Sequence, residues 1–438
     1  MTAITFTGLS SGLDTASLVS QLVAAERLPA DAIATKQSDL NTRKSILGSL
    51  SSALSSLGTI AQGMKLASDL QPRTAVSSDA HVAAAASSGA AATVHSVLVK
   101  QLARGQITSS RTFTSADAGV LGAGSLSMTV AGVTKSVAYD ATDSLSAIAS
   151  KINGAGAGAS ASVLFDGTSY RLMVAATATG TAAAPQFTET GDGLGLSTPA
   201  NIKVPAQDAI ATIDGVDVTR GSNVISDALA GVTLTLASPQ AATDPASSVT
   251  VALDTTSLTT KLTSLVNAYN SVNAALHVQL DYTGTKKGTD TLFGDSTLRQ
   301  LQGALGSIMS SGYGTGTATT LGSIGLTRST TGALSLDSTK LTAALAANPG
   351  AISDLFVTGG FATALTTMTD AYSRAGDGIL ASKTQSLVTQ FAQLQTQADH
   401  INNRADALKA QLEKQFTALE SSMSSLKSQS AFLTSVFK

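Results

Sequence analysis

The chain has 438 residues, long enough for roughly two to four domains, and its 27 Lys and Arg against 29 Asp and Glu give a formal net charge of −2. Charged residues make up only 13% of the chain, and no basic cluster exceeds Lys286-Lys287, so the basic face that a nucleic-acid binder needs is missing. The absence of cysteine excludes disulfides, thiolate nucleophiles and cysteine-ligated zinc.

No run approaches the ~18 consecutive apolar residues of a membrane-spanning helix, so we expect no membrane span. The opening residues have neither a basic nor an apolar signal-peptide region. We therefore expect no cleaved Sec signal, and a protein of this kind that leaves the cell would use another route.

The N-terminal region is predicted to be helical. Asp14 is a suitable N-cap for a short amphipathic helix, and Pro29 is expected to break that helix or to open the next one. A second helix is predicted from about residue 31 to 66. Its apolar residues follow the spacing of a coiled-coil seam: Leu40, Leu47, Leu50, Leu54, Leu57, Ala61 and Met64.

The middle of the chain is predicted to be rich in β-structure. Strand character begins at about Val94, and hairpins are predicted at 125–139 and 163–176. Between them lie a short helix at 143–153, capped by Asp143 or Ser144, and a glycine-rich hinge. Residues 177–200 lack periodicity, and a further β unit is predicted over 206–253.

Helical periodicity returns after Asp254. Helices are predicted from there to about residue 280 and at 295–310, 338–346 and 350–374, with a hairpin at 319–337. A terminal coiled coil follows, and its apolar ladder is Leu387, Phe391, Leu394, Ala398, Ile401, Ala405, Leu408, Leu412, Phe416, Leu419, Met423 and Leu426. The step of four residues from Leu412 to Phe416 follows another step of four, which is a stutter that locally unwinds a coiled coil.

A narrow seam of this kind cannot bury itself alone. It needs other helices, either from the far end of the same chain or from other copies. The predicted fold class is therefore α+β and multidomain, with terminal coiled-coil helices as leg and stem and with β-rich head domains inserted between them.

Candidate catalytic and metal sites are weak. Residues 8–12 (GLSSG) match the G-x-S-x-G nucleophile elbow, but only seven residues precede them, too few for the sheet that the elbow requires. None of the histidines is paired at metal-ligand spacing, so we expect solvated or helix-surface side chains at His81, His95, His277 and His400. We expect no enzyme, no cofactor and no metal.

Several segments resemble the flagellar hook-associated protein 2 family, also called the filament cap family. The N-terminal match runs through Gly8, Ser11, Gly12, Leu13 and Asp14 to Ala25, Glu26, Arg27 and Pro29. The second match, 206–236, contains Ser222-Asn223 and the run GVTL at 231–234. Further matches lie at 265–276, 321–345 and 412–437, and residues 124–153 resemble the hairpin-plus-helix insert of flagellins.

The resemblance implies four domains: a leg (1–42 and 405–438) with its tip at Gly12, Leu13 and Asp14, a stem (43–73 and 255–404), and β-rich head domains at 74–105 with 204–254 and at 106–203. It implies a ring of identical subunits at the tip of the flagellum, a pentamer by family default, with a tetramer or hexamer also possible. The implied partners are flagellin, the hook-filament junction proteins and a cytoplasmic export chaperone at the C-terminus, with no nucleic acid. Two other functions remain open, namely an adhesin whose head (106–200) binds a surface, and another axial protein of the flagellum.

Overall fold

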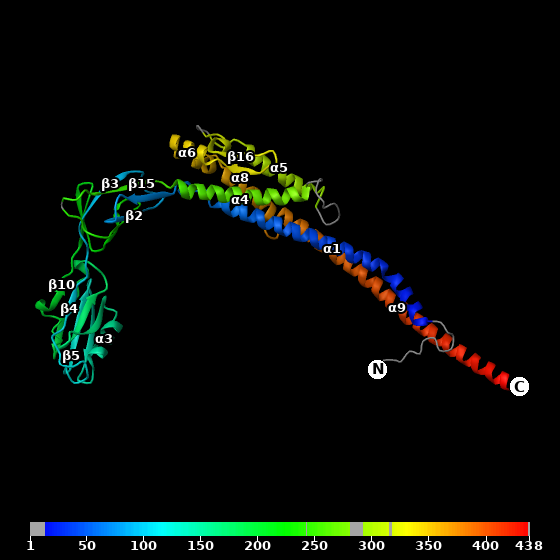
Figure 1. Ribbon diagram of the computed structural model, residues 1–438, viewed down its shortest axis with the longest axis horizontal. Helices are drawn as coiled ribbons and strands as arrows, with labels where there is room; N and C mark the ends of the chain where they lie inside the picture. The colour runs from blue at the N-terminus through cyan, green and yellow to red at the C-terminus, as the bar shows by residue number, and fades with distance from the viewer. Residues whose placement is uncertain (1–13, 242, 281–291, 315–317, 437–438) are drawn as a thin grey trace. The chain divides into compact units, whose positions relative to one another are not determined.

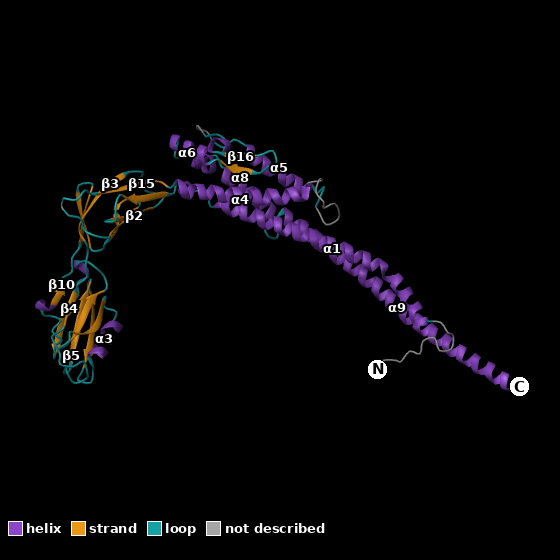
Figure 2. Ribbon diagram, in the orientation of Figure 1, coloured by secondary structure: helices purple, strands orange, loops and turns teal. Residues whose placement is uncertain are grey.

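The computed structural model describes residues 14–241, 243–280, 292–314 and 318–436 (Figure 1). The chain forms two compact units, one made of Met1–Ala67 and Thr259–Lys438 and the other of Ser68–Leu258. Figure 2 shows that the first unit is mainly helical and that the second is built mainly from strands. The predicted fold class, terminal helices around β-rich inserts, is confirmed.

The helical unit is built around two long helices from the two ends of the chain. Its elements are α1 (Thr15–Gln62), most of α4 (Thr255–Leu280), α5 (Ser296–Ser310), a 3-10 turn (Leu321–Ile324), β16 (Leu326–Arg328), β17 (Leu334–Leu336), α6 (Ser338–Ala347), α7 (Ala351–Ser353), a π-helical turn (Asp354–Thr358), α8 (Phe361–Ser373) and α9 (Ile379–Val436). The second half of α1 packs against α8 and α9. Its Leu47, Leu54 and Leu57 are fully buried.

Helix α1 is continuous, so the predicted break at Pro29 is wrong. Its start is as predicted, because the Asp14 carboxylate accepts the Ser17 N–H at 3.0 Å as an N-cap. Pro29 removes one N–H donor from the helix but lies on the exposed face, where water can satisfy the freed carbonyl. Val23 and Ile33 are buried on either side of it, and this packing holds the helix together.

The predicted helix at 350–374 is wrong in one respect, because it is divided. α7 and the π-helical turn end at Gly359, and Gly360, with φ at 80°, precedes α8. A left-handed residue cannot continue a right-handed helix, so the chain restarts there. The helices predicted at 295–310 and 338–346 and the hairpin within 319–337 are confirmed.

The second unit contains two β lobes, each with its own hydrophobic core. The first lobe consists of β1 (Arg73–Ser77), β2 (Val82–Ala86), β3 (Val94–Gln101), β11 (Ala209–Ile213), β12 (Val216–Arg220), β13 (Val224–Leu229), β14 (Val232–Leu236) and β15 (Ser247–Leu253), preceded by α2 (Ala67–Leu70). Its two antiparallel sheets have the orders β1-β15-β3-β11-β12 and β13-β14-β2. The core between them is made of Val, Ile, Leu and Ala side chains, such as Val97, Val249 and Leu234.

The inserted lobe lies between β3 and β11 in the sequence. It consists of β4 (Ile107–Ser109), β5 (Gly124–Val130), β6 (Val133–Tyr139), α3 (Leu145–Gly154), β7 (Ala159–Phe165), β8 (Tyr170–Ala176), a 3-10 turn (Thr181–Ala183), β9 (Gln186–Gly191), a second 3-10 turn (Pro199–Asn201) and β10 (Ile202–Val204). Its sheets have the orders β10-β4-β8-β7 and β6-β5-β9. Leu126, Ile148 and Leu172 lie in the common core.

The two predicted hairpins of this lobe and the helix between them are confirmed, with Ser144 as the helix cap. The glycine-rich segment predicted to be a hinge is instead a packed connection. Its Ala157 is 3% exposed, and a Cβ on Gly158 would lie 3.1 Å from Val130. Strands β1, β2, β4, β9, β10 and β13 were not predicted.

Candidate functional site

Helices α1 and α9 run antiparallel along each other in the helical unit (Figure 1). The partner number on α9 falls as the number on α1 rises. Arg27 pairs with Asp406, Gln37 bonds to Gln395, and Leu40 shares a small surface cleft with Leu387 and Phe391. The seam on α1 therefore packs against the seam on α9 within the same chain.

The N-terminal seam residues lie together on the buried side of α1 and just beyond it. Every residue of this predicted set is at most 9% exposed: Leu40, Leu47, Leu50, Leu54, Leu57 and Met64. The heptad spacing therefore located the packed face of this helix. Whether these residues also serve assembly stays a prediction.

The C-terminal seam changes along α9 from buried to exposed. Leu387, Ala398 and Ala405 are buried, whereas half-buried side chains are found at Phe391, Leu394, Ile401, Leu408, Leu412 and Phe416. Beyond the stutter, Leu419, Met423 and Leu426 are 42%, 37% and 58% exposed. The last part of the predicted seam, from Leu419 to Leu426, thus presents apolar side chains that no helix covers among the described residues.

The seam on α1 extends further toward the N-terminus than the sequence predicted. Val19 and Val23 are 6% and 7% exposed and form a cluster with Ala405, against which Leu412 and Phe416 pack. The signal was present, since Val19, Val23 and Ile33 continue the apolar stripe of Leu40 backward. The predicted interruption at Pro29, as a break or as the start of a second helix, hides this continuity.

Crossed ion pairs link the two helices in this segment and favour one register. Arg27 Nη2 lies 2.5 Å from Asp406 Oδ1, and the adjacent Glu26 pairs with Arg404. Because the side chains of Arg27 and Asp406 are 44% and 62% exposed, such a pair contributes only ~0.2–1 kcal/mol. These ion pairs form in only one alignment of the two helices. They therefore favour that alignment, although they add little to the free energy of folding. Glu26 and Arg27 are residues that the family resemblance singled out.

A more buried ion pair attaches α5 to the start of α9. Lys383 Nζ lies 2.5 Å from Asp295 Oδ2, and the side chains are 28% and 11% exposed. Asp295 is also the N-cap of α5, where it accepts the N–H groups of Thr297 and Leu298. Burial alone would raise the pKa of Asp295, but the Lys383 charge and these hydrogen bonds outweigh it and lower the pKa.

The predicted leg tip lies mostly outside the described residues. Gly12 and Leu13 are not described, nor is the 8–12 segment that matched the nucleophile elbow. Asp14 is described and acts as the N-cap of α1.

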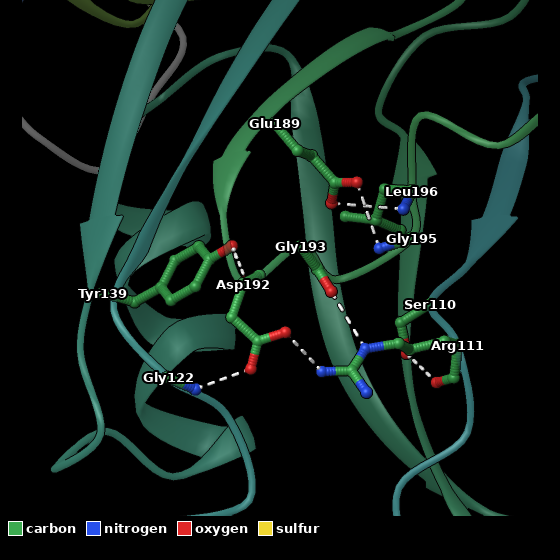
Figure 3. A network of polar contacts seen from close by, with 9 residues as sticks. All are labelled: Ser110, Arg111, Gly122, Tyr139, Glu189, Asp192, Gly193, Gly195 and Leu196. Atoms are coloured by element: carbon green, nitrogen blue, oxygen red, sulfur yellow. Dashed lines mark hydrogen bonds and ion pairs between the residues drawn. The ribbon is translucent and has the colours of Figure 1, made fainter.

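A polar network of the inserted lobe holds the loop after β9. Arg111 donates to the Gly193 carbonyl and to Asp192 Oδ1, both at 2.9 Å, while the second oxygen of Asp192 accepts the Gly122 N–H (Figure 3). Tyr139 donates to the Asp192 carbonyl at 2.8 Å, and its pKa is raised first by burial and then by neighbouring carboxylates. These groups form hydrogen bonds with one another, so we assign the network a structural role.

Two histidines have specific partners, so the expectation of solvated or helix-surface side chains is wrong for them. His81 Nδ1 lies 2.8 Å from the Ser238 hydroxyl. His95 lies between Asp214 and the Thr93 hydroxyl, at 2.7 and 2.8 Å. Asp214 has φ at 49°, and its other oxygen accepts the Ser96 N–H. This row ties the β11–β12 turn to the start of β3, and the bond to His95 is the main cause that lowers the pKa of Asp214.

In residues 14–241, 243–280, 292–314 and 318–436, no three His, Asp or Glu side chains gather where they could hold a metal ion. Within the same residues, no helix combines the length and the apolar character needed to cross a membrane.

Comparison with known proteins gives matches to one family along most of the chain. The model for the flagellar hook-associated protein 2 C-terminus matches residues 206–428, and that for the N-terminus of the same protein matches 11–106. The flagellin hook IN motif matches 125–178, overlapping the flagellin-like insert recognised at 124–153.

Individual relatives agree with these models. Flagellar hook-associated protein 2 of Escherichia coli K12 is 32% identical over 402 residues, covering 84% of this chain and 83% of its own length. The Salmonella typhimurium protein is 34% identical over 187 residues, covering 40% of this chain and 39% of its own. Among solved structures, the D1-D2-D3 domains of the Escherichia coli flagellar cap protein FliD align with a TM-score of 0.66 at 29% identity, covering 78% of this chain and 99% of that one.

Proposed function

Because this chain belongs to the flagellar hook-associated protein 2 family, whose solved Escherichia coli member is a flagellar cap protein, we propose that it works as a ring of identical subunits that promotes the folding and ordered polymerisation of exported flagellin. The ring sits at the filament tip and prevents loss of flagellin. A pentamer is the family default, and a tetramer or hexamer fits the same helices. The subunit leaves the cell through the flagellar type III system.

The observation that carries the proposal is the apolar stripe on the last turns of α9. Leu419, Met423 and Leu426 continue the seam spacing but stay exposed, and Leu433 follows at 54% exposure. A row of large apolar side chains on one helix face is costly in water and indicates an interaction surface. We assign it to the leg, 1–42 with 405–438, which docks on the filament end.

The same assignment gives the other parts their roles. The stem, 43–73 with 255–404, joins the leg to the two head domains, 74–105 with 204–254 and 106–203, which form a lid over incoming flagellin. The hook-filament junction proteins are the first surface on which the cap docks, and an export chaperone covers the C-terminal stripe before export. No catalytic role is assigned to any residue.

We further propose that the weakly charged seam allows the leg to slide as subunits are added. The seam residues of α9 are flanked mainly by Ser, Thr, Gln and Ala. Sparse charge specifies the partner weakly, and the stutter at Leu412–Phe416 locally unwinds the pair.

The test is complementation of a strain that lacks the cap gene. We would change Leu419, Met423 and Leu426 to Gln, which keeps helix propensity and removes the stripe. The matched control changes Ser421, Ser424 and Ser428, all exposed on α9, to Gln. The stripe variant should be non-motile and spill flagellin into the medium, while the control should restore filaments.

Normal filaments with the stripe variant would refute the role of this surface. A cap-deleted strain that grows full filaments but fails to attach to surfaces would favour the adhesin function instead. Removing 405–438 should abolish capping while leaving a soluble head and stem, and a truncated chain that restores motility would contradict this.

A further inference from the structure

The two β lobes of the second unit are joined by only two crossings of the chain. Their hydrophobic cores share no residue, because one is built from residues 82–103 and 209–251 and the other from 113–196. The chain enters the inserted lobe near Arg104 and returns near Gln207. Two domains joined in this way normally move relative to each other.

The two crossing segments pair with each other as a short ribbon. The Arg104 N–H donates to the Gln207 carbonyl at 2.9 Å, and the Gln207 N–H donates back at 3.1 Å. The Arg104 guanidinium also reaches the Gln207 side-chain oxygen at 2.9 Å. An isolated two-stranded ribbon is only marginally stable, so this pairing alone would not prevent bending.

A separate segment of the inserted lobe makes a third attachment. Asp208, which directly precedes β11 of the first lobe, accepts the Thr181 N–H at 2.7 Å on one carboxylate oxygen and the Thr181 hydroxyl at 2.8 Å on the other. Hydrogen bonds to an ionised carboxylate are roughly twice as strong as neutral ones. The Gly180 N–H donates to the Arg104 carbonyl at 3.1 Å. The segment that contains Thr181 is therefore also hydrogen-bonded to the crossing ribbon.

Beside this attachment the two lobes touch backbone to backbone. The Thr179 hydroxyl donates to the Gly221 carbonyl of the first lobe at 2.7 Å. Gly180 has φ at 94°, and a Cβ built on it would lie 2.5 Å from Gly221 Cα and 2.6 Å from its carbonyl oxygen. Only glycine satisfies both the backbone conformation and the close approach.

The first lobe also holds the incoming strand from its own side. Asn223 accepts the Ala103 N–H at 2.7 Å and donates to the Ala103 carbonyl at 3.1 Å, directly before the crossing. Gln207 anchors the Leu102 carbonyl at 2.7 Å. The chain is therefore already fixed when it leaves the first lobe.

We propose that residues 179–181 of the inserted lobe, held by Asp208 and Gly221 of the first lobe, form a latch that locks the two β lobes into one rigid body. The crossing ribbon alone would act as a hinge between the lobes. A second attachment, from a separate segment of the inserted lobe, opposes motion about that hinge. The inference concerns the isolated subunit and does not depend on the cap function. In it Asp208 is a positioning residue whose removal frees one lobe to swing against the other.

The experiment measures the distance between the lobes in the full chain. The chain has no cysteine, so Lys135→Cys on β6 and Thr219→Cys on β12, both exposed, place one spin label on each lobe. Double electron–electron resonance should give a narrow distance distribution in the otherwise unchanged chain. Asp208→Ala should broaden it, and exchange of the Thr181 amide hydrogen should accelerate roughly 10- to 100-fold, the factor that a charge-assisted hydrogen bond is worth.

Asp166→Ala is the matched control. Asp166 also accepts two backbone N–H groups and one hydroxyl, but from its own turn within the inserted lobe. It should leave the distribution narrow. Asp208→Asn, which keeps one acceptor oxygen, should fall between wild type and Asp208→Ala, and Gly180→Ala should broaden the distribution by forcing the contact open.

Each result decides the proposal. A broad distribution in the unchanged chain would overturn it. So would a narrow distribution in Asp208→Ala once faster Thr181 exchange confirms that the bond is lost. Broadening with unchanged amide protection in both cores would support it, since a merely structural loss would expose the cores as well.

Discussion

Gly58 sets the distance between helices α1 and α8. A Cβ built on Gly58 would lie 2.5 Å from Thr369 Oγ1 and 3.2 Å from Thr369 Cβ, and Thr369 is fully buried. Replacing a helical glycine by alanine gains ~1 kcal/mol of helix propensity, while overpacking a buried contact costs about 1–3 kcal/mol. Gly58→Ala should therefore lower the free energy of unfolding by about 0–2 kcal/mol.

Gly48 on the same helix provides the control, because a Cβ there meets nothing within 4 Å. Gly48→Ala should gain up to ~1 kcal/mol, so the two variants should differ by about 1–3 kcal/mol. The assay is urea unfolding followed by far-ultraviolet circular dichroism. Adding Thr369→Ala to Gly58→Ala should recover most of the loss, since the Thr369 hydroxyl bonds only within its own helix. Equal stability of the two Gly→Ala variants would refute this account of the packing.

Three further predictions concern other parts of the molecule. Asn270→Ala should lower the free energy of unfolding by about 2–4 kcal/mol, because it leaves both backbone groups of the buried Leu334 unpaired. Asn267→Ala, at an exposed position of the same helix, should leave the free energy of unfolding unchanged. Urea unfolding of the two variants tests this. Bonds from backbone and hydroxyl groups of its own turn lower the pKa of Asp166 from 3.8 to about 2, so its contribution is complete above the unfolded pKa and lost as pH falls toward 2. Wild type should therefore lose more stability than Asp166→Asn across that window, and equal losses in acid unfolding would contradict this. Deleting the four residues 413–416 removes the stutter and returns the seam to alternating steps of three and four, and it should impair motility in swim plates; normal filament growth would mean that the stutter has no mechanical role.

The parts of the fold that the sequence predicted are those set by residues close together along the chain. Leu47 and Leu54 lie one heptad apart, and their burial follows from local periodicity. Strand β1 pairs with β15, for example Arg73 with Leu253, and nothing near Arg73 in the sequence specifies that partner. Strand β2 is mostly alanine, so its pattern was too weak to predict, and it forms because β14 supplies the neighbouring hydrogen bonds.

The same distinction applies to the paired helices. Spacing located the seam, but the extension to Val19 depended on a tertiary contact with Ala405 that overrides the local effect of Pro29. The ion pairs of Glu26 and Arg27 could be suspected only from the family resemblance, since their partners lie at the other end of the chain. The contacts of Asp208 could not be predicted from the neighbouring sequence, because its partner Thr181 lies in the inserted lobe.

Asparagine side chains recur where this weakly charged chain must close an open backbone. Asn153 both accepts the N–H and donates to the carbonyl of Ala161 on edge strand β7, Asn223 does the same for Ala103, and Asn270 for Leu334. Each carboxamide thus substitutes for the peptide group of a missing neighbouring strand. Natural sheets often protect such edges with charged side chains, above all lysine. A chain with only 13% charged residues has few to place there, and an amide that satisfies both backbone groups removes the open edge instead of merely repelling a second strand. Aspartate at any of these positions would lose the donor and bring a negative charge toward a carbonyl oxygen, so these sites require the amide and not merely a polar side chain.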